Sequence, residues 1–269
     1  MNESKEYAAG LKLSRRLAAL ADWVPEGARF ADIGTDHALL PVYLAAIGRI
    51  PFAVAGDVHA GPAEAARRQV EAAGLSGVVS VRLGDGLSVL SPGEVDTVCI
   101  AGMGGSLMVR LLEAAGPRLQ GVRTLILSPH VAEDQVRRWL VDRQYALEDE
   151  RLLAEDGETY TLMRAVYVAD AAEAAARNDR LYDEALLTPR CPDVPRELLL
   201  AMGPLLLREA GETFRAKWRA ELAKREKILA QLRLGQSAGA EEKARAWEEE
   251  SRRIEEVLSC TQEGRPLSN

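Results

Sequence analysis

Near its start the chain reads Arg29-Phe30-Ala31-Asp32-Ile33-Gly34-Thr35-Asp36-His37, a short apolar run followed by a glycine and polar side chains. A glycine directly after a strand lets the backbone turn sharply and approach a ligand at the carboxyl edge of a sheet. The segment departs from the dinucleotide pattern Gly-x-Gly-x-x-Gly, because Asp36 replaces the second glycine and its carboxylate would repel a pyrophosphate. Taken alone, the segment predicts either a plain strand-to-helix turn or a site for a ligand without phosphates.

Strand-like and helix-like segments alternate around this stretch, over residues 28–168. Such alternation predicts a parallel sheet covered by helices. The expected strands are Arg29–Ile33, Pro51–Asp57, Val78–Leu83, Val95–Ala101 and Val122–Ser128, and the expected helices span 38–48, 61–73, 105–115 and 132–143. The chain therefore holds five βα units in a row.

The pattern changes after the fifth unit. Tyr145–Ala154 and Thr159–Val168 are strand-like and are joined by Glu155-Asp156-Gly157-Glu158, in which Asp-Gly is a strong hairpin signal because both turn residues must accept positive φ. Five parallel units closed by an antiparallel hairpin are the layout of class I S-adenosylmethionine-dependent methyltransferases, whereas a dinucleotide dehydrogenase more often continues with parallel strands. The predicted fold class is α/β, with a Rossmann-like methyltransferase sheet.

The remainder of the chain is expected to be mostly helical. Residues 169–183 are Ala-rich, and a linker-like stretch follows that is punctuated by Pro189, Pro192, Pro195 and Pro204. Two long helix-prone segments then end near Leu234 and Leu258, with a break at 235–239, and they predict a coiled-coil helical hairpin. Three parts are expected: a cofactor-binding domain at 1–170, a helical and Pro-rich connector at 171–204, and the helical hairpin at 205–269.

The two halves of the predicted helical hairpin carry opposite charge. Residues 205–235 hold eight Lys and Arg against four Glu, a net +4, whereas residues 240–258 hold four against seven, a net −3. Either the opposite charges help the helices to pair, or the basic helix contacts a phosphate backbone. The candidate RNA-binding side chains on the basic helix are Lys217, Arg219, Lys224 and Arg225.

Composition excludes several classes of protein. With 47% hydrophobic and 28% charged residues, the chain is neither collagen-like, nor disordered, nor a disulfide scaffold. A net charge of −7 argues against coating nucleic acid by bulk charge.

Cys99, Cys191 and Cys260 form no Cys-x-x-Cys pair and are expected to be buried or incidental thiols in a reducing cytosol. No apolar run approaches a membrane span and Met1–Glu6 lacks signal-peptide features, so a cytoplasmic location is expected.

Acidic side chains follow the second and third strands as well as the first. Ala55-Gly56-Asp57 ends the second strand, where a carboxylate can accept hydrogen bonds from the ribose hydroxyls of an adenosine cofactor. Gly84-Asp85-Gly86-Leu87 follows the third, where the aspartate can accept a hydrogen bond from an adenine amino group and the leucine can pack on its ring. A lone Gly-Asp-Gly is more often a turn. Three acidic strand ends at one sheet edge indicate a cofactor site.

The fourth strand ends in the glycine-rich run Ile100-Ala101-Gly102-Met103-Gly104-Gly105. Three glycines in four residues weaken a strand or helix. We therefore expect that they leave the backbone carbonyls and amides accessible to a flat ligand. In class I enzymes this is where the acceptor base meets the methyl group. Ser128-Pro129-His130 borders the same mouth, and His130 either binds or deprotonates an acceptor or is a strand-end histidine held by backbone.

With these motifs, the chain resembles the bacterial tRNA (adenine-N1) methyltransferases of the TrmK family, which modify adenine 22 at the end of the D-arm. The most specific matches are the Asp36-His37 pair and the Ala-Gly-Met-Gly-Gly run. The family often has Glu where this chain has Asp57, and Gln-Pro-Asn where it has Ser128-Pro129-His130. Further matches are Leu11–Leu17, the whole of Ala31–His37, Ala55–Asp57, Gly84–Leu87, Glu155–Gly157 with Tyr160, Gly203-Pro204 and the terminal hairpin.

The resemblance implies methyl transfer from S-adenosylmethionine to N1 of adenine 22 in tRNA, without a metal and with no obligatory protein partner. The expected cofactor-binding residues are Arg16, Asp32, Gly34, Thr35, Asp36, His37, Asp57, Val58, Asp85, Gly86, Ala101, Gly102 and Met103. The residues expected to orient or stabilise the reacting groups are Asp36, His37, Met103, Gly104 and His130. Arg15 is expected to contact tRNA, and Tyr160 either to pack near the mouth of the site or to be a cross-strand aromatic. The alternatives are a small-molecule methyltransferase and a non-catalytic RNA-binding protein of this fold.

Overall fold

The fold is that of a computed structural model, in which residues 10–191, 193–234 and 238–262 are described. The chain forms two compact units, Met1–Asn178 and Asp179–Asn269. The boundary between them lies inside the stretch predicted to be a connector. The division into three functional parts stays a prediction.

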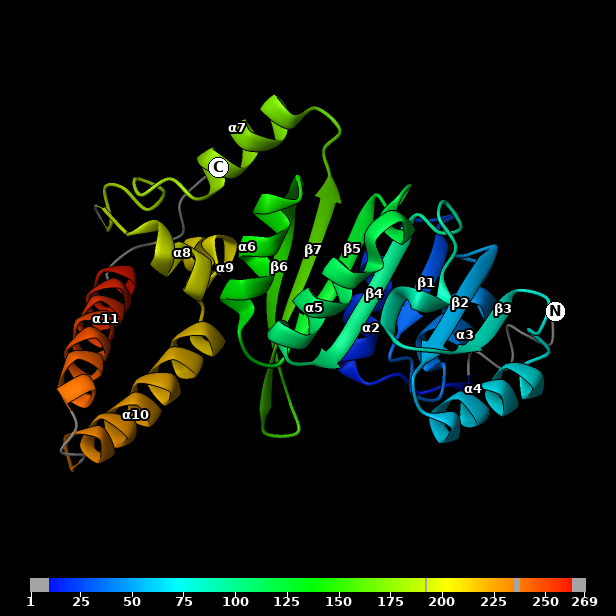
Figure 1. Ribbon diagram of the computed structural model, residues 1–269, viewed down its shortest axis with the longest axis horizontal. Helices are drawn as coiled ribbons and strands as arrows, with labels where there is room; N and C mark the ends of the chain where they lie inside the picture. Colours follow the sequence, from blue (N-terminus) through cyan, green and yellow to red (C-terminus); the bar gives the residue numbers. More distant parts are fainter. Residues whose placement is uncertain (1–9, 192, 235–237, 263–269) are drawn as a thin grey trace. The chain divides into compact units, whose positions relative to one another are not determined.

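A seven-stranded sheet forms the centre of the described part of the first unit (Figure 1). Its strands are β1 (Arg29–Ile33), β2 (Phe52–Asp57), β3 (Val79–Leu83), β4 (Thr97–Met103), β5 (Thr124–Pro129), β6 (Tyr145–Glu155) and β7 (Glu158–Tyr167). They are ordered β3-β2-β1-β4-β5-β7-β6. Strands β1 to β5 pair in parallel, whereas β7 pairs antiparallel with β5 and β6. The predicted fold class is confirmed.

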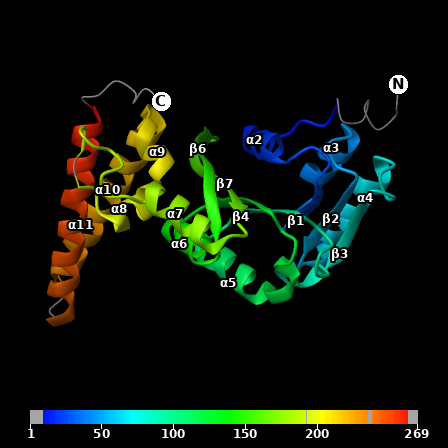
Figure 2. The same cartoon turned by 90° about the horizontal axis from the view of Figure 1, so that it is seen from above.

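Helices cover both faces of this sheet, as Figure 2 shows. On one face, α2 (Arg15–Trp23), α3 (Leu39–Ala46) and α4 (Ala60–Ala72) pack their apolar side chains against β1, β2 and β4 in the main core. On the other face lie α5 (Gly105–Ala115) and α6 (Glu133–Asp142), which contact each other. Because both faces are covered, β2 and β5 are apolar along most of their length. The remaining elements are the short helices η1 (Gly86–Val89) and η2 (Gly116–Leu119), and α7 (Ala171–Leu181), which follows β7.

The hairpin of β6 and β7 turns where the Asp-Gly signal places it. Asp156 and Gly157 have φ values of 52° and 82°, the left-handed backbone that a two-residue hairpin turn requires. In the pairing of β5 with β7, Leu127 lies opposite Met163. Since β7 runs antiparallel to β5, the hairpin tip projects past the carboxyl end of β5. The tip therefore lies at the sheet edge where the predicted site residues gather.

The second unit contains more helices than the sequence predicted. The stretch interpreted as a linker holds α8 (Arg196–Met202), and the single long helix expected after Pro204 is divided into α9 (Pro204–Glu209) and α10 (Glu212–Leu234). Both corrections have a local reason. Pro195 is the N-cap of α8 and Pro204 the first residue of α9, positions where a missing N–H costs little. Pro192 lies outside the described residues.

The predicted helical hairpin is present and consists of α10 and α11 (Ala238–Gln262). Arg225 of α10 forms an ion pair with Glu250 of α11 at 2.9 Å, and its guanidinium carbon lies 5.3 Å from the ring centroid of Trp247. Opposite charges on the two helices therefore help them to pair, at least at this position. Residues 235–237, where the sequence predicted the break, lie outside the described part of the chain.

The prediction that all three cysteines are incidental thiols is wrong for two of them. Cys191 and Cys260, which are 69 residues apart in sequence, form a disulfide within the second unit. The fold of the connector brings Cys191 against the end of α11, and a separation of that length gives no signal in the sequence. Cys99 of β4 is a buried free thiol, as expected.

Candidate active site

The carboxyl ends of β1 and β4 meet at the glycine that follows β1. The amides of Gly34 and Thr35 both donate to the carbonyl of Gly56, at 2.8 and 3.1 Å, which fixes the turn after β1. The Met103 side chain from the end of β4 fills the space above this turn, because a Cβ on Gly34 would lie only 2.3 Å from Met103 Cε. The structure thus brings together residues from two of the predicted motifs.

Asp32 is a buried carboxylate at the end of β1, with only 6% of its surface exposed. Thr35 Oγ1 donates a hydrogen bond to its Oδ2 at 2.7 Å. Burial raises the pKa of Asp32 from 3.8 to about 6; the Thr35 hydrogen bond and Arg16 oppose this rise, and the charge of Asp57 adds to it. A carboxylate that is buried in this way favours a cationic ligand beside it.

Asp57 lies at the end of β2 and is also buried. Its Oδ1 accepts a hydrogen bond from the His59 amide at 2.8 Å, which orients the carboxylate. The neighbouring Val58 and Leu83 expose 53% and 54% of their surface, so two apolar side chains flank this carboxylate. Asp85, in the loop after β3, is exposed as well.

The expected packing of Leu87 against an adenine ring is wrong. Leu87 is only 1% exposed and belongs to the core, because η1 turns it inward. Leu83 is the exposed apolar residue of that loop region, and the sequence interpretation missed it. The signal in the sequence was its position as the last residue of the expected strand Val78–Leu83, which the structure pairs with Asp57 at the end of β2.

A cationic and aromatic cluster lies on the other side of the same edge. Glu155 at the hairpin tip accepts hydrogen bonds from the amides of Arg15 and Arg16, at 2.6 and 3.2 Å, and so holds the first turn of α2. The Arg16 guanidinium carbon then lies 4.6 Å from the ring centroid of Tyr160. The centroid of the His130 ring lies 5.4 Å from that of the same tyrosine. Tyr160, expected either near the mouth of the site or as a cross-strand aromatic, contacts two predicted site residues.

Gly102 lies between Arg16 and His130. The pairing of β4 with β5 shifts register between Ala101 and Met103, so Gly102 is the extra residue of a bulge, with φ of 78°. A Cβ here would lie 3.7 Å from Arg16 Nη1 and 3.9 Å from His130 Nε2. Arg16 Nη1 is buried and has no hydrogen-bond partner among the described residues. A buried guanidinium nitrogen without a hydrogen-bond acceptor indicates a place for an anionic ligand group.

The last two glycines of the run lie at the start of α5. Gly104 is the N-cap of that helix, and the Gly105 amide donates to the Val131 carbonyl at 2.8 Å. A Cβ on Gly105 would lie 2.3 Å from the carbonyl oxygen of Ala132. All three glycines were expected to expose the backbone to a ligand. This expectation is wrong for Gly105, which is needed for close packing against the loop after β5.

Asp36 and His37 are exposed at the turn into α3. Their side chains are 77% and 58% exposed, and His37 Nε2 lies 3.5 Å from Asp36 Oδ1. Asp36 and Ala38 both have positive φ, at 38° and 53°, which is uncommon for residues with a side chain. Strained turns of this kind cluster at functional sites. The pair lies in the loop after β1 and directly follows Thr35, the hydrogen-bond partner of Asp32.

The predicted RNA-binding residues differ in how available they are. Arg15 is exposed, although its Nη1 also donates to the Ala154 carbonyl at 3.2 Å. Arg219 and Lys224 are exposed on α10. Arg225 has a side chain only 14% exposed and pairs with acidic residues of the hairpin, and Lys217 is half-buried and has a partner.

Among the described residues, no three His, Cys, Asp or Glu side chains are grouped to hold a metal ion, and no helix is long and apolar enough to cross a membrane.

A parallel sheet closed by an antiparallel hairpin, with carboxylates at the ends of β1 and β2, defines a class I methyltransferase. A family model described as a methyltransferase domain matches residues 13–163. The chain is 40% identical over 245 residues to the tRNA (adenine(22)-N(1))-methyltransferase of Bacillus subtilis, an alignment that covers 91% of this chain and 95% of that protein. The chain belongs to this family, the TrmK methyltransferases.

Solved structures of relatives agree with this assignment. The crystal structure of the B. subtilis M1A22 tRNA methyltransferase TrmK matches with a TM-score of 0.81 and 36% identity, over 92% of this chain and 99% of that one. A Streptococcus pneumoniae protein in complex with S-adenosyl-L-methionine matches with a TM-score of 0.73 and 32% identity, over 92% and 100% of the two chains.

Proposed function

We propose that the protein transfers a methyl group from S-adenosyl-L-methionine to N1 of an adenine in tRNA, adenine 22 of the D-arm. The kinship with the B. subtilis enzyme supports the reaction and the substrate. The observation that carries the proposal is the set of charges at one sheet edge: two buried carboxylates, Asp32 and Asp57, and the buried, unpartnered Nη1 of Arg16. A ligand with an amino group, a carboxylate and ribose hydroxyls complements all three.

The residues at this edge fit the cofactor group by group. Asp32 is suited to the ammonium group, because a cation offsets the cost of its buried charge. Arg16 is suited to the carboxylate and Asp57 to the ribose hydroxyls. Val58 and Leu83 offer apolar surface to the adenine ring. When bound, the cofactor supplies a methyl group on a sulfonium, which is already a strong electrophile.

The acceptor base is expected to lie beside Gly102. The Met103 carbonyl already accepts a hydrogen bond from the His130 amide at 3.0 Å, so the unpaired backbone of Gly102 is the better acceptor for the adenine amino group. Tyr160 and His130 offer ring faces for the base. The protein's task is to align the adenine nitrogen with the methyl carbon, and no covalent nucleophile is needed. A carboxylate such as Asp36 would stabilise the positive charge that develops on the base.

The proposal is tested by mass spectrometry of nucleosides from unmodified tRNA incubated with the protein and S-adenosyl-L-methionine. We expect N1-methyladenosine at one nucleotide, position 22. The base has to leave its stack to react, at a cost of a few kcal/mol, so a tRNA with a stabilised pair at that position should react more slowly. Cofactor binding without any methylation of a tRNA that has adenine 22 would favour a small-molecule methyltransferase instead.

The helical hairpin is proposed to dock tRNA through the exposed basic residues of α10. Substituting Arg219 and Lys224 together with Ala is expected to weaken tRNA binding and to reduce the slope of log affinity against log salt by about one for each phosphate that is no longer neutralised. The matched control is the double substitution of Lys243 and Arg245 with Ala, two equally exposed residues on the acidic helix α11. Equal weakening in the two variants, or unchanged affinity in both, would exclude docking through α10.

The other partners and the location follow from the substrate. A tRNA substrate implies a cytoplasmic location and requires no membrane contact. We propose that Lys217 and Arg225 stabilise the helical hairpin in the first place and contact RNA only in the second, because both already have partners in the folded chain.

A further inference from the structure

A cavity lies at the edge of the sheet opposite the candidate active site. Its volume is about 720 Å³, and it is bounded by the carboxyl-terminal ends of α5 and α6, the start of β6, the end of β7 and the segment that leads into β5. The candidate active site lies at the carboxyl end of β5, whereas this cavity lies at its amino end. Nothing in the proposed methyl transfer uses it.

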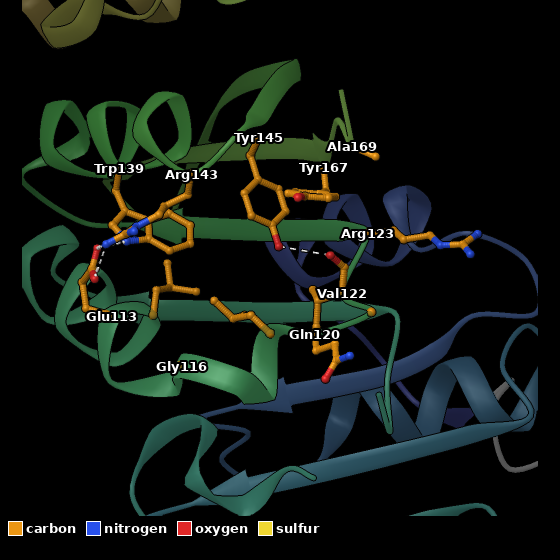
Figure 3. A pocket seen from close by; sticks show the side chains of 13 residues that line it. Glu113, Gly116, Gln120, Val122, Arg123, Trp139, Arg143, Tyr145, Tyr167 and Ala169 are labelled. Atoms are coloured by element: carbon orange, nitrogen blue, oxygen red, sulfur yellow. Dashed lines mark hydrogen bonds and ion pairs between the residues drawn. The ribbon is translucent and has the colours of Figure 1, made fainter. Parts of the chain in front are cut away.

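Three aromatic side chains form a wall of this cavity (Figure 3). The rings of Trp139 and Tyr145 are stacked, with centroids 5.8 Å apart and an interplanar angle of 25°. The ring of Tyr167 meets that of Tyr145 edge-on, with centroids 5.5 Å apart. Tyr167 is 42% exposed, whereas Trp139 and Tyr145 are buried, so the ring of Tyr167 is the one most open to a ligand. Such a wall suits a flat aromatic ligand.

The polar atoms of the two inner rings are already satisfied. Trp139 Nε1 donates to Glu113 Oε1 at 2.5 Å, and the Tyr145 hydroxyl donates to the Val122 carbonyl at 3.1 Å. These bonds fix the rings in place before any ligand arrives. A preformed wall loses little side-chain freedom on binding.

The charges around the cavity favour an anion. Glu113, the one carboxylate among the lining residues, is neutralised by Arg143, with Nη2 2.7 Å from Oε2. Arg123 lies at the opposite end of the cavity from this pair (Figure 3). Its side chain is exposed and has no hydrogen-bond or ion-pair partner in the described part of the chain. With one Glu and two Arg, the lining carries a net charge of +1. A cationic ligand would have no free carboxylate to pair with in this lining, because Glu113 is already paired with Arg143.

We propose that this cavity binds a nucleotide, with the base against the aromatic wall and the phosphate on Arg123. Gln120, which also lines the cavity, offers an amide that can donate to or accept from a base edge. The nucleotide is either a free mononucleotide or a nucleotide of the bound tRNA. The second source rests on the proposed function, whereas the first does not.

The test has two arms that use the full-length protein saturated with S-adenosylhomocysteine, so that the cofactor site is filled. In the first, AMP, GMP, CMP and UMP are titrated by calorimetry. In the second, tRNA affinity is measured by filter binding. Each arm compares Arg123→Gln and Tyr167→Ala with two matched controls. Arg118→Gln removes a neighbouring arginine that does not line the cavity, and Tyr167→Phe keeps the ring.

We expect Arg123→Gln and Tyr167→Ala each to weaken binding about tenfold or more, while both controls stay within twofold of the wild type. Weaker binding in the mononucleotide arm with unchanged tRNA affinity identifies a free nucleotide as the ligand, and weaker binding in both arms identifies a nucleotide of the RNA that the free mononucleotide mimics. Weaker binding confined to the tRNA arm identifies a nucleotide of the RNA. Arg123 is exposed, so Arg123→Gln remains informative even if Tyr167→Ala disturbs folding in a thermal melt. Unchanged affinity in both arms, or an equal effect of Arg118→Gln, would overturn the proposal.

Discussion

Asp32→Asn is expected to make the cofactor-free protein more stable at pH 8 while weakening its affinity for the cofactor about 10- to 100-fold. The pKa of Asp32 is raised by burial from 3.8 to about 6. The native state therefore binds a proton more readily than the unfolded chain does between these two values. Stability is lost as the pH rises through this window, and above pH 6 the buried charge costs up to about 3 kcal/mol. Asparagine has the same shape, carries no charge, and can still accept the Thr35 hydrogen bond.

Unfolding of the Asn variant and of the wild type is to be compared at pH 8 and at pH 4, without cofactor. Most of the difference in stability should disappear at pH 4, where Asp32 is largely protonated in the native state. Asp22→Asn, at an exposed position, is the matched control and should change little. For the wild type, cofactor affinity should fall as the pH is lowered below 6. An Asn variant with lower stability at pH 8 and unchanged affinity would mean that Asp32 has a structural role only.

The parts of the fold that could be predicted depend on local signals. The alternation of strands and helices reflects burial on both faces of a sheet, and Asp156-Gly157 fixes the hairpin because few other residues accept its backbone. The short helix α8 was missed because prolines were interpreted as breakers, although Pro195 begins that helix. Disulfide formation between Cys191 and Cys260 depends on the fold of the whole second unit, which no local pattern encodes.

The candidate site divides in the same way. Carboxylates at the ends of parallel strands converge by topology, so the edge that holds Asp32 and Asp57 could be predicted before any geometry was known. The contact between Arg16 and Tyr160 could not, because it depends on Glu155 capping α2 across 139 residues of sequence. The roles of Gly102 and Gly105 also looked alike in sequence. Only the neighbouring atoms distinguish a bulge at the site from a packing contact.

Arg16→Met is expected to lower cofactor affinity about 10- to 100-fold in the absence of tRNA, because the variant cannot form a hydrogen-bonded charge pair with the cofactor carboxylate. The buried Nη1 of Arg16 has no hydrogen-bond partner in the described protein, so the substitution breaks no hydrogen bond at that atom. It does remove the charge that opposes the raised pKa of Asp32. Arg16→Lys should restore only part of the affinity, since the guanidinium also stacks on Tyr160 and an ammonium does not replace that geometry.

Arg15→Met is the matched neighbour for this test, because Arg15 occupies the same helix turn with an exposed side chain. We expect it to leave binding of S-adenosylhomocysteine unchanged in calorimetry and to weaken tRNA binding. If Arg16→Met instead keeps its affinity for S-adenosylhomocysteine and raises the KM for tRNA, then Arg16 faces the acceptor base. In that case Asp32 and Asp57 hold the cofactor without it, and the cation beside Gly102 must be assigned to the RNA.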